Sequence, residues 1–440
     1  FTSRLTLLLA MVGVAVGLGN VWRFPYMVGR FGGAAFVAFY LALALVVGAP
    51  ALMAEWTLGR HTRRGTVGAF ARAGVRGGRA LGWIFFVGVT AATGYYCAAI
   101  GWVVAHAIGE LVRGAGGAWS AARVLPPESG LDPAGFGLQA VATAAVMGAC
   151  ALVLVRGVRR GIERVSTVAT PLLFVILIAL ALRALTLPGA GAGLDWYLLK
   201  FAPGDLNARV AMAALGQVIF SLALGGTFMV VYGSYLPDDV DLRANAAATV
   251  AGDTLAGLLA GLAIFPAVFA LGLEPASGPG LIFSTLPRVF AGVPGGWVFG
   301  ALFFAALAAA AYLSAVAAFE VLVAGLVDEA GWSRRRATLA VVGGAYLLSL
   351  PPTLNLRIFT PWDLAFGTGL QTVGALAAAL TVGWALSRSA VLRELAGRDD
   401  APPGLGLLYL WIRWVVPGAI LAVGVWWILT AVLGLVADPT

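Results

Sequence analysis

One stretch near the start of the chain constrains the fold more than any other: Val14-Ala-Val-Gly17-Leu-Gly19-Asn20-Val-Trp-Arg23-Phe-Pro25. It interrupts a strongly apolar segment with glycines, an asparagine, an arginine and a proline. A helix in a lipid bilayer must satisfy its backbone hydrogen bonds internally, because hydrocarbon offers no replacement partners. A break at this depth is therefore tolerated only where the freed amides and carbonyls face protein or a solvated cavity. Such groups can bind an anion and a cation, so the stretch predicts a binding site inside the membrane.

The composition places the whole chain in the membrane class. Hydrophobic residues make up 61% of it and charged residues 11%, with a mean hydropathy of +0.94. A helix of about 20 apolar residues crosses a hydrocarbon core of about 30 Å. We predict eleven membrane-spanning segments, at roughly 5–29, 34–58, 80–112, 135–155, 165–185, 209–235, 244–273, 296–327, 337–351, 364–387 and 407–436.

The distribution of basic residues predicts the topology. A net charge of +8 is compatible with a nucleic-acid partner. However, the arginines gather after spans 2, 4, 8 and 10, all on one side of the membrane if the spans alternate. The positive-inside rule makes this side cytoplasmic, so we expect the N-terminus inside, the C-terminus outside and no nucleic-acid partner. Lys200 is the single lysine in a chain rich in Ala, Gly and Arg, a composition typical of a GC-rich bacterial genome. We therefore expect the membrane to be a bacterial inner membrane.

A second interruption lies in the sixth span, where paired glycines, Gly225 and Gly226, follow an apolar run. Broken spans five apart are what two five-helix repeats would give, and an odd number of helices makes the second repeat inverted. Two interrupted spans at matching positions indicate the substrate site of a transporter. The alternative, that the glycines only allow close helix packing, explains one cluster better than two.

The predicted fold class is therefore an all-α integral membrane protein of eleven transmembrane helices, in which helices 1 and 6 are interrupted. We expect a single transporter domain over residues 1–440. The first inverted repeat is predicted at about 1–185, the second at about 209–388 and the eleventh helix at about 405–437.

Several blocks of the chain resemble the neurotransmitter:sodium symporters, most closely their bacterial amino-acid transporters of the leucine-transporter type. The resemblance runs from Phe1 to about Ala437, although many relatives have a twelfth span. The matching blocks are Gly17-Leu-Gly19-Asn20-Val-Trp-Arg23-Phe-Pro25, Glu55-Trp-Thr-Leu-Gly59-Arg60, Gly161-Ile-Glu163-Arg164, Gln217 to Gly225, and Asp328-Glu-Ala-Gly-Trp-Ser-Arg.

The resemblance implies that a substrate lies between the halves of spans 1 and 6. The helix that begins after Gly19 presents free amides and a positive dipole end, which suit a carboxylate. Relatives that carry monoamines have an acid where Gly17 stands, so a glycine here leaves room for the substrate's own anion. Small pocket residues favour bulky hydrophobic or aromatic amino acids. The substrate-binding residues implied are Ala15, Gly17, Leu18, Gly19, Ala92, Tyr96, Phe220, Ser221, Ala223, Leu224, Gly226, Ser314 and Ala318.

The resemblance also implies oxygen-ligand sites for Na⁺, a hard cation. The first takes Ala15, Asn20, Ser221, Asp253 and the substrate carboxylate. Alternatively, Asp253 is a hydrogen-bonded structural acid. The second takes Gly13, Val16, Ala310 and Ser314, but Leu313 stands where the family usually has a second hydroxyl, which leaves two-sodium coupling open. Relatives have a serine or an acid near Gly257, and this chain has neither, so we expect chloride not to be required.

Gate residues follow from the same resemblance. Arg23 and Asp363 match the outer gate, with Phe220 as a lid; Ser234, Tyr235 and Asp328 match the inner gate. Glu55 is expected to hydrogen-bond the broken backbone of span 6. For Glu320, an acid in span 8, the sequence identifies no partner; we favour a capped structural carboxyl over a proton-linked site.

Together these features predict a sodium-coupled symporter of hydrophobic amino acids that works by alternating access, without catalytic residues. A proton-coupled carrier of the same fold, titrating at Asp253 or Glu320, is one alternative. A receptor or channel on the same scaffold is another. The predicted partners are a small-molecule amino acid and membrane lipid.

Overall fold

The computed structural model describes residues 4–118, 124–275, 281–292, 295–397 and 404–433. Helices account for the regular structure in these ranges, and none of the described residues forms a strand. The predicted end of the eleventh helix, residues 434–437, lies outside the described residues.

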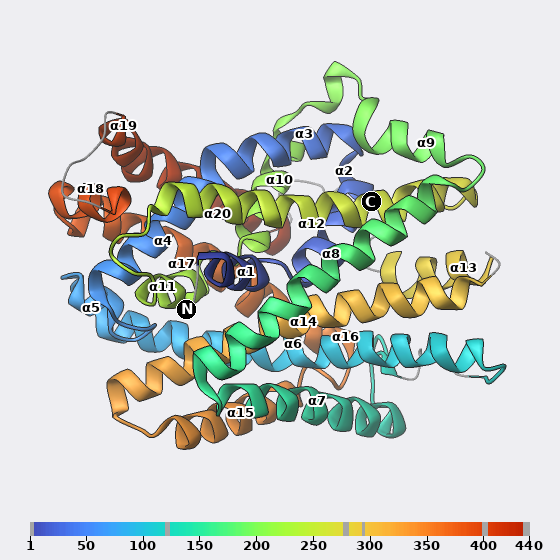
Figure 1. The fold of residues 1–440 in the computed structure, drawn as a ribbon, viewed down its shortest axis with the longest axis horizontal. Helices are drawn as coiled ribbons and strands as arrows, with labels where there is room; N and C mark the ends of the chain where they lie inside the picture. Colours follow the sequence, from blue (N-terminus) through green and yellow to red (C-terminus); the bar gives the residue numbers. More distant parts are fainter. Residues whose placement is uncertain (1–3, 119–123, 276–280, 293–294, 398–403, 434–440) are drawn as a thin grey trace.

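Most spans are long helices with few breaks (Figure 1). The unbroken or gently bent spans are α3–α4 with a π-helical join (Ala34–Leu43, Ala49–Thr62), α6 (Gly78–Gly114), α7 (Pro133–Leu154), α8 (Arg164–Leu185), α12 (Leu242–Ala270), α14 (Gly296–Ala330), α15 (Arg334–Ser349), α16–α17 (Leu356–Trp362, Leu370–Leu380) and α19–α20 (Leu405–Leu410, Val416–Trp427). The broken spans are α1, η1 and α2 (Arg4–Ala15, Gly19–Arg23, Phe24–Phe31), and α10 and α11 (Ala208–Ser221, Phe228–Ser234).

Short helices connect these spans. They are α5 (Ala69–Arg72), α9 (Ala190–Leu194), α13 (Leu286–Ala291) and α18 (Arg388–Ala396), with a 3₁₀ turn at Pro203–Asp205 and π-helical stretches at Asp195–Leu199 and Leu281–Thr285. Further π-helical stretches lie within the spans or at their ends, at Ala44–Gly48, Val158–Glu163, Asp363–Gly369, Thr381–Ala385, Trp411–Val415 and Ile428–Val432.

The number of spans agrees with the sequence prediction. Within the described ranges, eight helices are long and apolar enough to cross a membrane, and one bent pair brings these to nine. The broken pair α10–α11 and the 16-residue α15 complete eleven. The all-helical eleven-span architecture is therefore confirmed.

Span 1 breaks where the glycines predicted it. α1 ends at Ala15, π-helical backbone begins at Gly19, and the two segments are bent by 54°. The freed amide of Gly17 donates to Asn20 Oδ1 at 3.0 Å, and the amide of Leu18 donates to Tyr96 Oη at 3.3 Å. Side chains thus replace the backbone partners that the break removes.

Span 6 breaks through a different backbone conformation. Between α10 and α11, Ala223, Gly225 and Thr227 all have positive φ, at 51°, 83° and 59°. Positive φ at non-glycine residues is strained and persists only where the surroundings impose it. Here the Gly225 amide donates to Glu55 Oε1 at 2.6 Å, which confirms the expected role of Glu55.

Both breaks lie at the boundary between two packed cores. One core contains buried side chains from α3, α4, α10, α11 and spans 10 and 11; the other contains those from α6, α7, α8, α14 and α15. Span 1 contributes to both, with Met11 in the first and Val12 in the second. In Figure 1, α6, α7, α14 and α15 lie in the lower half of the molecule, and α3 and α12 run along the upper half. The broken helices are thereby positioned between two bodies.

Candidate functional site

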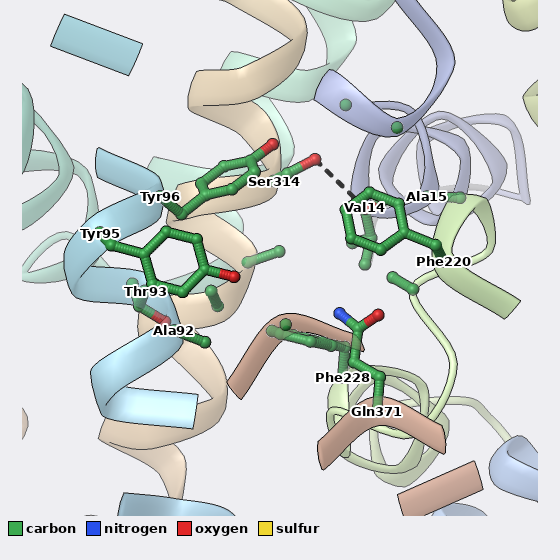
Figure 2. A pocket seen from close by; sticks show the side chains of 16 residues that line it. Val14, Ala15, Ala92, Thr93, Tyr95, Tyr96, Phe220, Phe228, Ser314 and Gln371 are labelled. Atoms are coloured by element: carbon green, nitrogen blue, oxygen red, sulfur yellow. Dashed lines mark hydrogen bonds between the residues drawn. The ribbon is translucent and has the colours of Figure 1, made fainter. Parts of the chain in front are cut away.

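A cavity of about 90 Å³ lies between the two breaks, and a larger outer cavity of about 450 Å³ shares some of its walls. The side chains around the central cavity come from spans 1, 3, 6, 8 and 10 (Figure 2). The lining residues are Val14, Ala15, Gly17, Gly19, Ala92, Thr93, Tyr95, Tyr96, Phe220, Ala223, Phe228, Ser314, Ala317, Ala318, Gly367 and Gln371. Nine of the thirteen predicted substrate residues are among them.

One end of the cavity is polar and tightly packed around Gly17. A Cβ at Gly17 would lie 2.4 Å from Ser314 Oγ and 3.0 Å from Tyr96 Oη, so no side chain fits there without displacing both. Tyr96 Oη accepts from the Leu18 amide, which leaves its own proton free to donate. Ser314 Oγ lies 3.2 Å from the Val16 carbonyl, which it can donate to. This end can therefore offer hydrogen-bond donors to an anion.

A cluster of oxygen and amide groups lies beside this end. Asn20 Nδ2 donates to Asp253 Oδ1 at 2.7 Å and to Ser221 Oγ at 2.9 Å, and Tyr40 donates to Asp253 Oδ2 at 3.0 Å. Ser221 also donates to the carboxylate, at 2.8 Å. Asp253 is fully buried, yet all its partners in the described part of the chain are neutral. An uncompensated buried charge is costly, so this carboxylate fits a cation as its missing partner.

The second predicted ion position is less polar. Ala310 is fully buried, and Leu313 points its side chain toward span 1, where a Cβ at Gly13 would lie 3.5 Å from Leu313 Cδ1. The same Cβ would lie 3.0 Å from Thr170 Oγ1 of span 5, whose hydroxyl donates to the Leu9 carbonyl. An isobutyl group therefore occupies the place where a second hydroxyl was expected.

The opposite end of the cavity is formed by small residues together with Phe228 and Gln371. Predicted residues Leu224 and Gly226 are buried but do not line it, because the ring of Phe228 covers Gly226: a Cβ there would lie 1.9 Å from Phe228 Cε2. Sequence reasoning missed Gly367 and Gln371. A usable signal existed, since Asp363, Gly367 and Gln371 recur at intervals of four and so share one helix face.

The outer gate residues line the larger cavity together but bind other partners. Arg23 places its guanidinium 4.4 Å from the centre of the Phe220 ring, and its buried Nη1 has no hydrogen-bond partner in the part of the chain that the structure describes. Asp363 Oδ1 accepts from Tyr95 Oη at 2.9 Å. The described contacts include no Arg23–Asp363 ion pair, so the gate pair is separated in this structure.

On the inner side, polar contacts join several spans. Glu320, fully buried, accepts from Tyr235 Oη at 2.9 Å and from Arg334 Nη1 at 3.2 Å. Arg334 also donates to the Leu154 carbonyl. The partner that sequence reasoning could not identify for Glu320 is thus Arg334, at the start of span 9.

The other inner residues are also engaged. Asp328 Oδ2 accepts from the Gly65 amide at 3.2 Å, and Ser234 Oγ donates to the Val231 carbonyl at 2.6 Å. Arg60, buried at the end of span 2, binds Glu394 of α18 at 2.7 Å. The contacts of Asp328 and Arg60 tie span 2 and the loop after it to span 8 and to α18 on the inner side of the cavity.

An eleven-span membrane protein with two broken helices around a central cavity is, by class, a secondary transporter. Comparison with known proteins supports the assignment to this class. The model of the sodium:neurotransmitter symporter family matches residues 1–114 and 122–426, and the chain belongs to that family. It is a multi-pass, sodium-coupled membrane transporter, and its family works by symport rather than by enzyme catalysis.

Relatives are found among bacterial and animal transporters. An uncharacterized sodium-dependent transporter of Bacillus subtilis, YhdH, is 34% identical over 451 residues, covering 96% of each chain. The bovine sodium-dependent dopamine transporter is 27% identical over 436 residues, covering 87% of this chain and 62% of its own. The crystal structure of MhsT in complex with L-phenylalanine matches with a TM-score of 0.83 and 34% identity, over 97% of this chain and 98% of MhsT.

Proposed function

We propose that this chain is a sodium-coupled symporter of hydrophobic L-amino acids that favours bulky or aromatic side chains. The observation that carries the proposal is the asymmetry of the central cavity. One end offers hydrogen-bond donors beside a buried carboxylate, and the other is walled by small residues. MhsT, of the same fold, binds L-phenylalanine, which supports an amino acid as the substrate class.

The amino acid's carboxylate would bind at the Gly17 end. The Tyr96 hydroxyl is the donor, because its oxygen accepts from the Leu18 amide and its proton stays free. The positive end of the helical segment that begins at Gly19 adds to the attraction. The amino group would face the free carbonyls of the same break. Ala92, Ala223, Ala317 and Ala318 leave space for the side chain, and Phe220 closes the cavity toward the outer side.

Sodium and the amino acid would bind cooperatively. At the first site, Na⁺ takes the Ala15 carbonyl, the side chains of Asn20, Ser221 and Asp253, and the substrate carboxylate. Because the two solutes then share ligands, each raises the other's affinity by the same factor. The neutral surroundings of Asp253 support this role over that of a structural acid, because a structural carboxylate at this depth would need a cation of its own.

Na⁺ at the second site would use Gly13, Val16, Ala310 and Ser314. With Leu313 beside them, this site has fewer ligands and binds sodium weakly. Chloride is not required in this proposal, because the Asp253 carboxylate already supplies a negative charge beside the first sodium, bonded to Tyr40 and Ser221.

In alternating access, the outer gate would be open while the inner gate is closed, and the reverse. Separated outer residues, Arg23 and Asp363, together with the joined inner contacts of Tyr235 and Glu320, support an outward-facing arrangement. Binding of substrate beneath Phe220 would bring Arg23 and Asp363 together, and the inner contacts would then release. We place the basic, inner side in the cytoplasm of a bacterial cell, with the N-terminus inside and the C-terminus outside.

The testing experiment is uptake of radiolabelled tryptophan into proteoliposomes under an inward sodium gradient, with competition by the other amino acids. We expect sodium-dependent accumulation that bulky hydrophobic amino acids inhibit and that small or charged ones do not. Replacing sodium by choline should abolish it, and replacing chloride by gluconate should not.

Three results would contradict the proposal. Accumulation driven by a proton gradient alone would identify a proton-coupled carrier. Binding without accumulation, or ion currents that exceed coupled flux, would identify a receptor or a channel. Uptake restricted to small polar amino acids would contradict the substrate class alone.

A further inference from the structure

Gln371 is the first polar side chain of α17 and lines the far end of the central cavity. It shares a helix face with Asp363 and Gly367, so one face of span 10 runs from the outer gate down to the cavity. Gln371 also lines a neighbouring cavity between spans 1, 6, 10 and 11, so its amide lies in the wall between the two spaces.

The backbone of Gln371 is fixed by an unusually close approach of two helices. A Cβ at Gly225 would lie 1.6 Å from the Gln371 carbonyl oxygen, and one at Gly374 would lie 1.7 Å from the Gly225 carbonyl oxygen. Backbone packs against backbone here, and only two glycines permit it. Span 10 therefore sits in a fixed register on the break of span 6, which sets where the Gln371 side chain enters the cavity.

The Gln371 amide has unused hydrogen-bonding capacity. Its Oε1 is buried without any hydrogen-bond partner among the described residues. Other polar groups in the same wall are satisfied: Thr93 Oγ1 donates to the Val89 carbonyl at 2.7 Å, and Tyr95 Oη donates to Asp363. An unpaired buried acceptor lowers the stability of the protein. A ligand that donates a hydrogen bond to this oxygen therefore gains binding free energy.

The Gln371 amide faces the space that the substrate's side chain would occupy. Figure 2 shows Gln371 beside Phe228, with its amide directed into the cavity and with Tyr96 and Ser314 on the opposite side. A substrate held by its carboxylate at Tyr96 therefore extends its side chain toward Gln371. The amide can offer its oxygen or, after a half-turn, its nitrogen.

We propose that Gln371 binds a polar group at the far end of the substrate's side chain, so that the transporter selects aromatic amino acids carrying a hydrogen-bond donor there. The indole N–H of tryptophan and the phenol O–H of tyrosine are such donors, and phenylalanine and leucine have none. This inference rests on the proposed function and refines its substrate class.

The test is competition against tritiated tryptophan binding to the purified full-length protein in sodium buffer. The competitors are tryptophan, phenylalanine and 1-methyltryptophan, in which a methyl group replaces the indole proton. The variants are Gln371→Met, which keeps length and removes both polar atoms, and Gln371→Glu, which keeps an acceptor.

We expect Gln371→Met to weaken tryptophan binding by about 3- to 10-fold, the value of one hydrogen bond, and to leave phenylalanine within about 2-fold. The preference for tryptophan over 1-methyltryptophan should shrink by the same factor. Gln371→Glu should keep both preferences. Reading each preference as a ratio within one variant separates recognition from a general loss of folded protein.

Equal weakening of tryptophan and phenylalanine in Gln371→Met would overturn the inference and assign Gln371 a purely structural role. An unchanged tryptophan preference in that variant would overturn it as well. If the unmodified protein binds no amino acid at all, the proposed function itself fails, a result distinct from either of these.

Discussion

The two ends of the central cavity differ in polarity and in the size of their side chains. At the Gly17 end, polar groups bond one another: the Gly17 amide donates to Asn20, the Leu18 amide donates to Tyr96, and Asp253 accepts from three side chains. At the Gln371 end, the walls are small residues and aromatic rings, and the amide oxygen has no hydrogen-bond partner within the described ranges. The first end is rigid and charged, whereas the second is spacious and nearly apolar.

This difference separates two tasks. Groups at the rigid end bind what every amino acid has in common and couple it to sodium, so changes there should affect all substrates alike. Groups at the spacious end contact the part that differs between amino acids, so changes there should alter selectivity. Mutations at the two ends can therefore test the comparison directly.

The largest expected effect is at Asp253. Asp253→Asn keeps the size of the side chain and one accepting oxygen and removes its charge, so the first sodium loses its anionic ligand. We expect sodium-dependent binding of every amino acid to fall about 100-fold or more. Binding measured against sodium concentration checks this, with Glu110→Gln, a carboxylate paired with Arg113 far from the site, as the control. Undiminished sodium dependence would remove Asp253 from the ion site.

Next comes Tyr96. Tyr96→Phe removes the hydroxyl that donates to the carboxylate and keeps the ring, so a charge-assisted hydrogen bond is lost. Affinity should fall about 10- to 100-fold, by a similar factor for tryptophan, phenylalanine and leucine. Competition binding checks this, and Tyr346→Phe, whose hydroxyl meets the Ala140 carbonyl, is the matched control. A loss confined to one amino acid would contradict the division of tasks.

A smaller effect, on selectivity, is expected at Ala318. Ala318→Phe fills the spacious end, so tryptophan should lose about 10-fold in affinity relative to alanine, because overpacking penalises the larger side chain. The same substitution at Ala305, exposed on the outer face of α14, is the control for helix insertion. Uptake competition with both amino acids measures the ratio. If the ratio does not change, Ala318 does not contact the substrate's side chain.

The smallest effect is expected at Leu313. Leu313→Thr supplies the missing hydroxyl beside Ser314, and we expect the sodium concentration for half-maximal uptake to fall about 2- to 10-fold. Leu313→Val, which has the shape of threonine without its hydroxyl, is the control and should show no gain. The dependence of uptake on sodium should also become steeper in the threonine variant. Equal behaviour of the two variants would mean that the second site does not use this position.

The sequence by itself determined the architecture. Apolar runs and arginine clusters predicted eleven spans, and the glycine clusters predicted both breaks, which begin after Ala15 and Ser221 in the structure. These features are local: the cost of unpaired backbone in lipid acts on each segment separately, so it can be read from composition along the chain. Gly17 and Asn20 of the polar end lie within a few residues of each other in the sequence, whereas Tyr96, Ser221 and Asp253 were implied by the family resemblance.

Only the tertiary structure decided the spacious end and the inner contacts. Gln371 faces the cavity because Gly225 and Gly374 let two helices meet at backbone distance, and Glu320 is neutralised by Arg334 from the next span. Phe228, not Gly226, forms the wall because its ring turns over the glycine. Each of these depends on the register and rotation of one helix against another. Sequence periodicity gives the face that a residue occupies, but the residue opposite it is set by packing across the whole bundle.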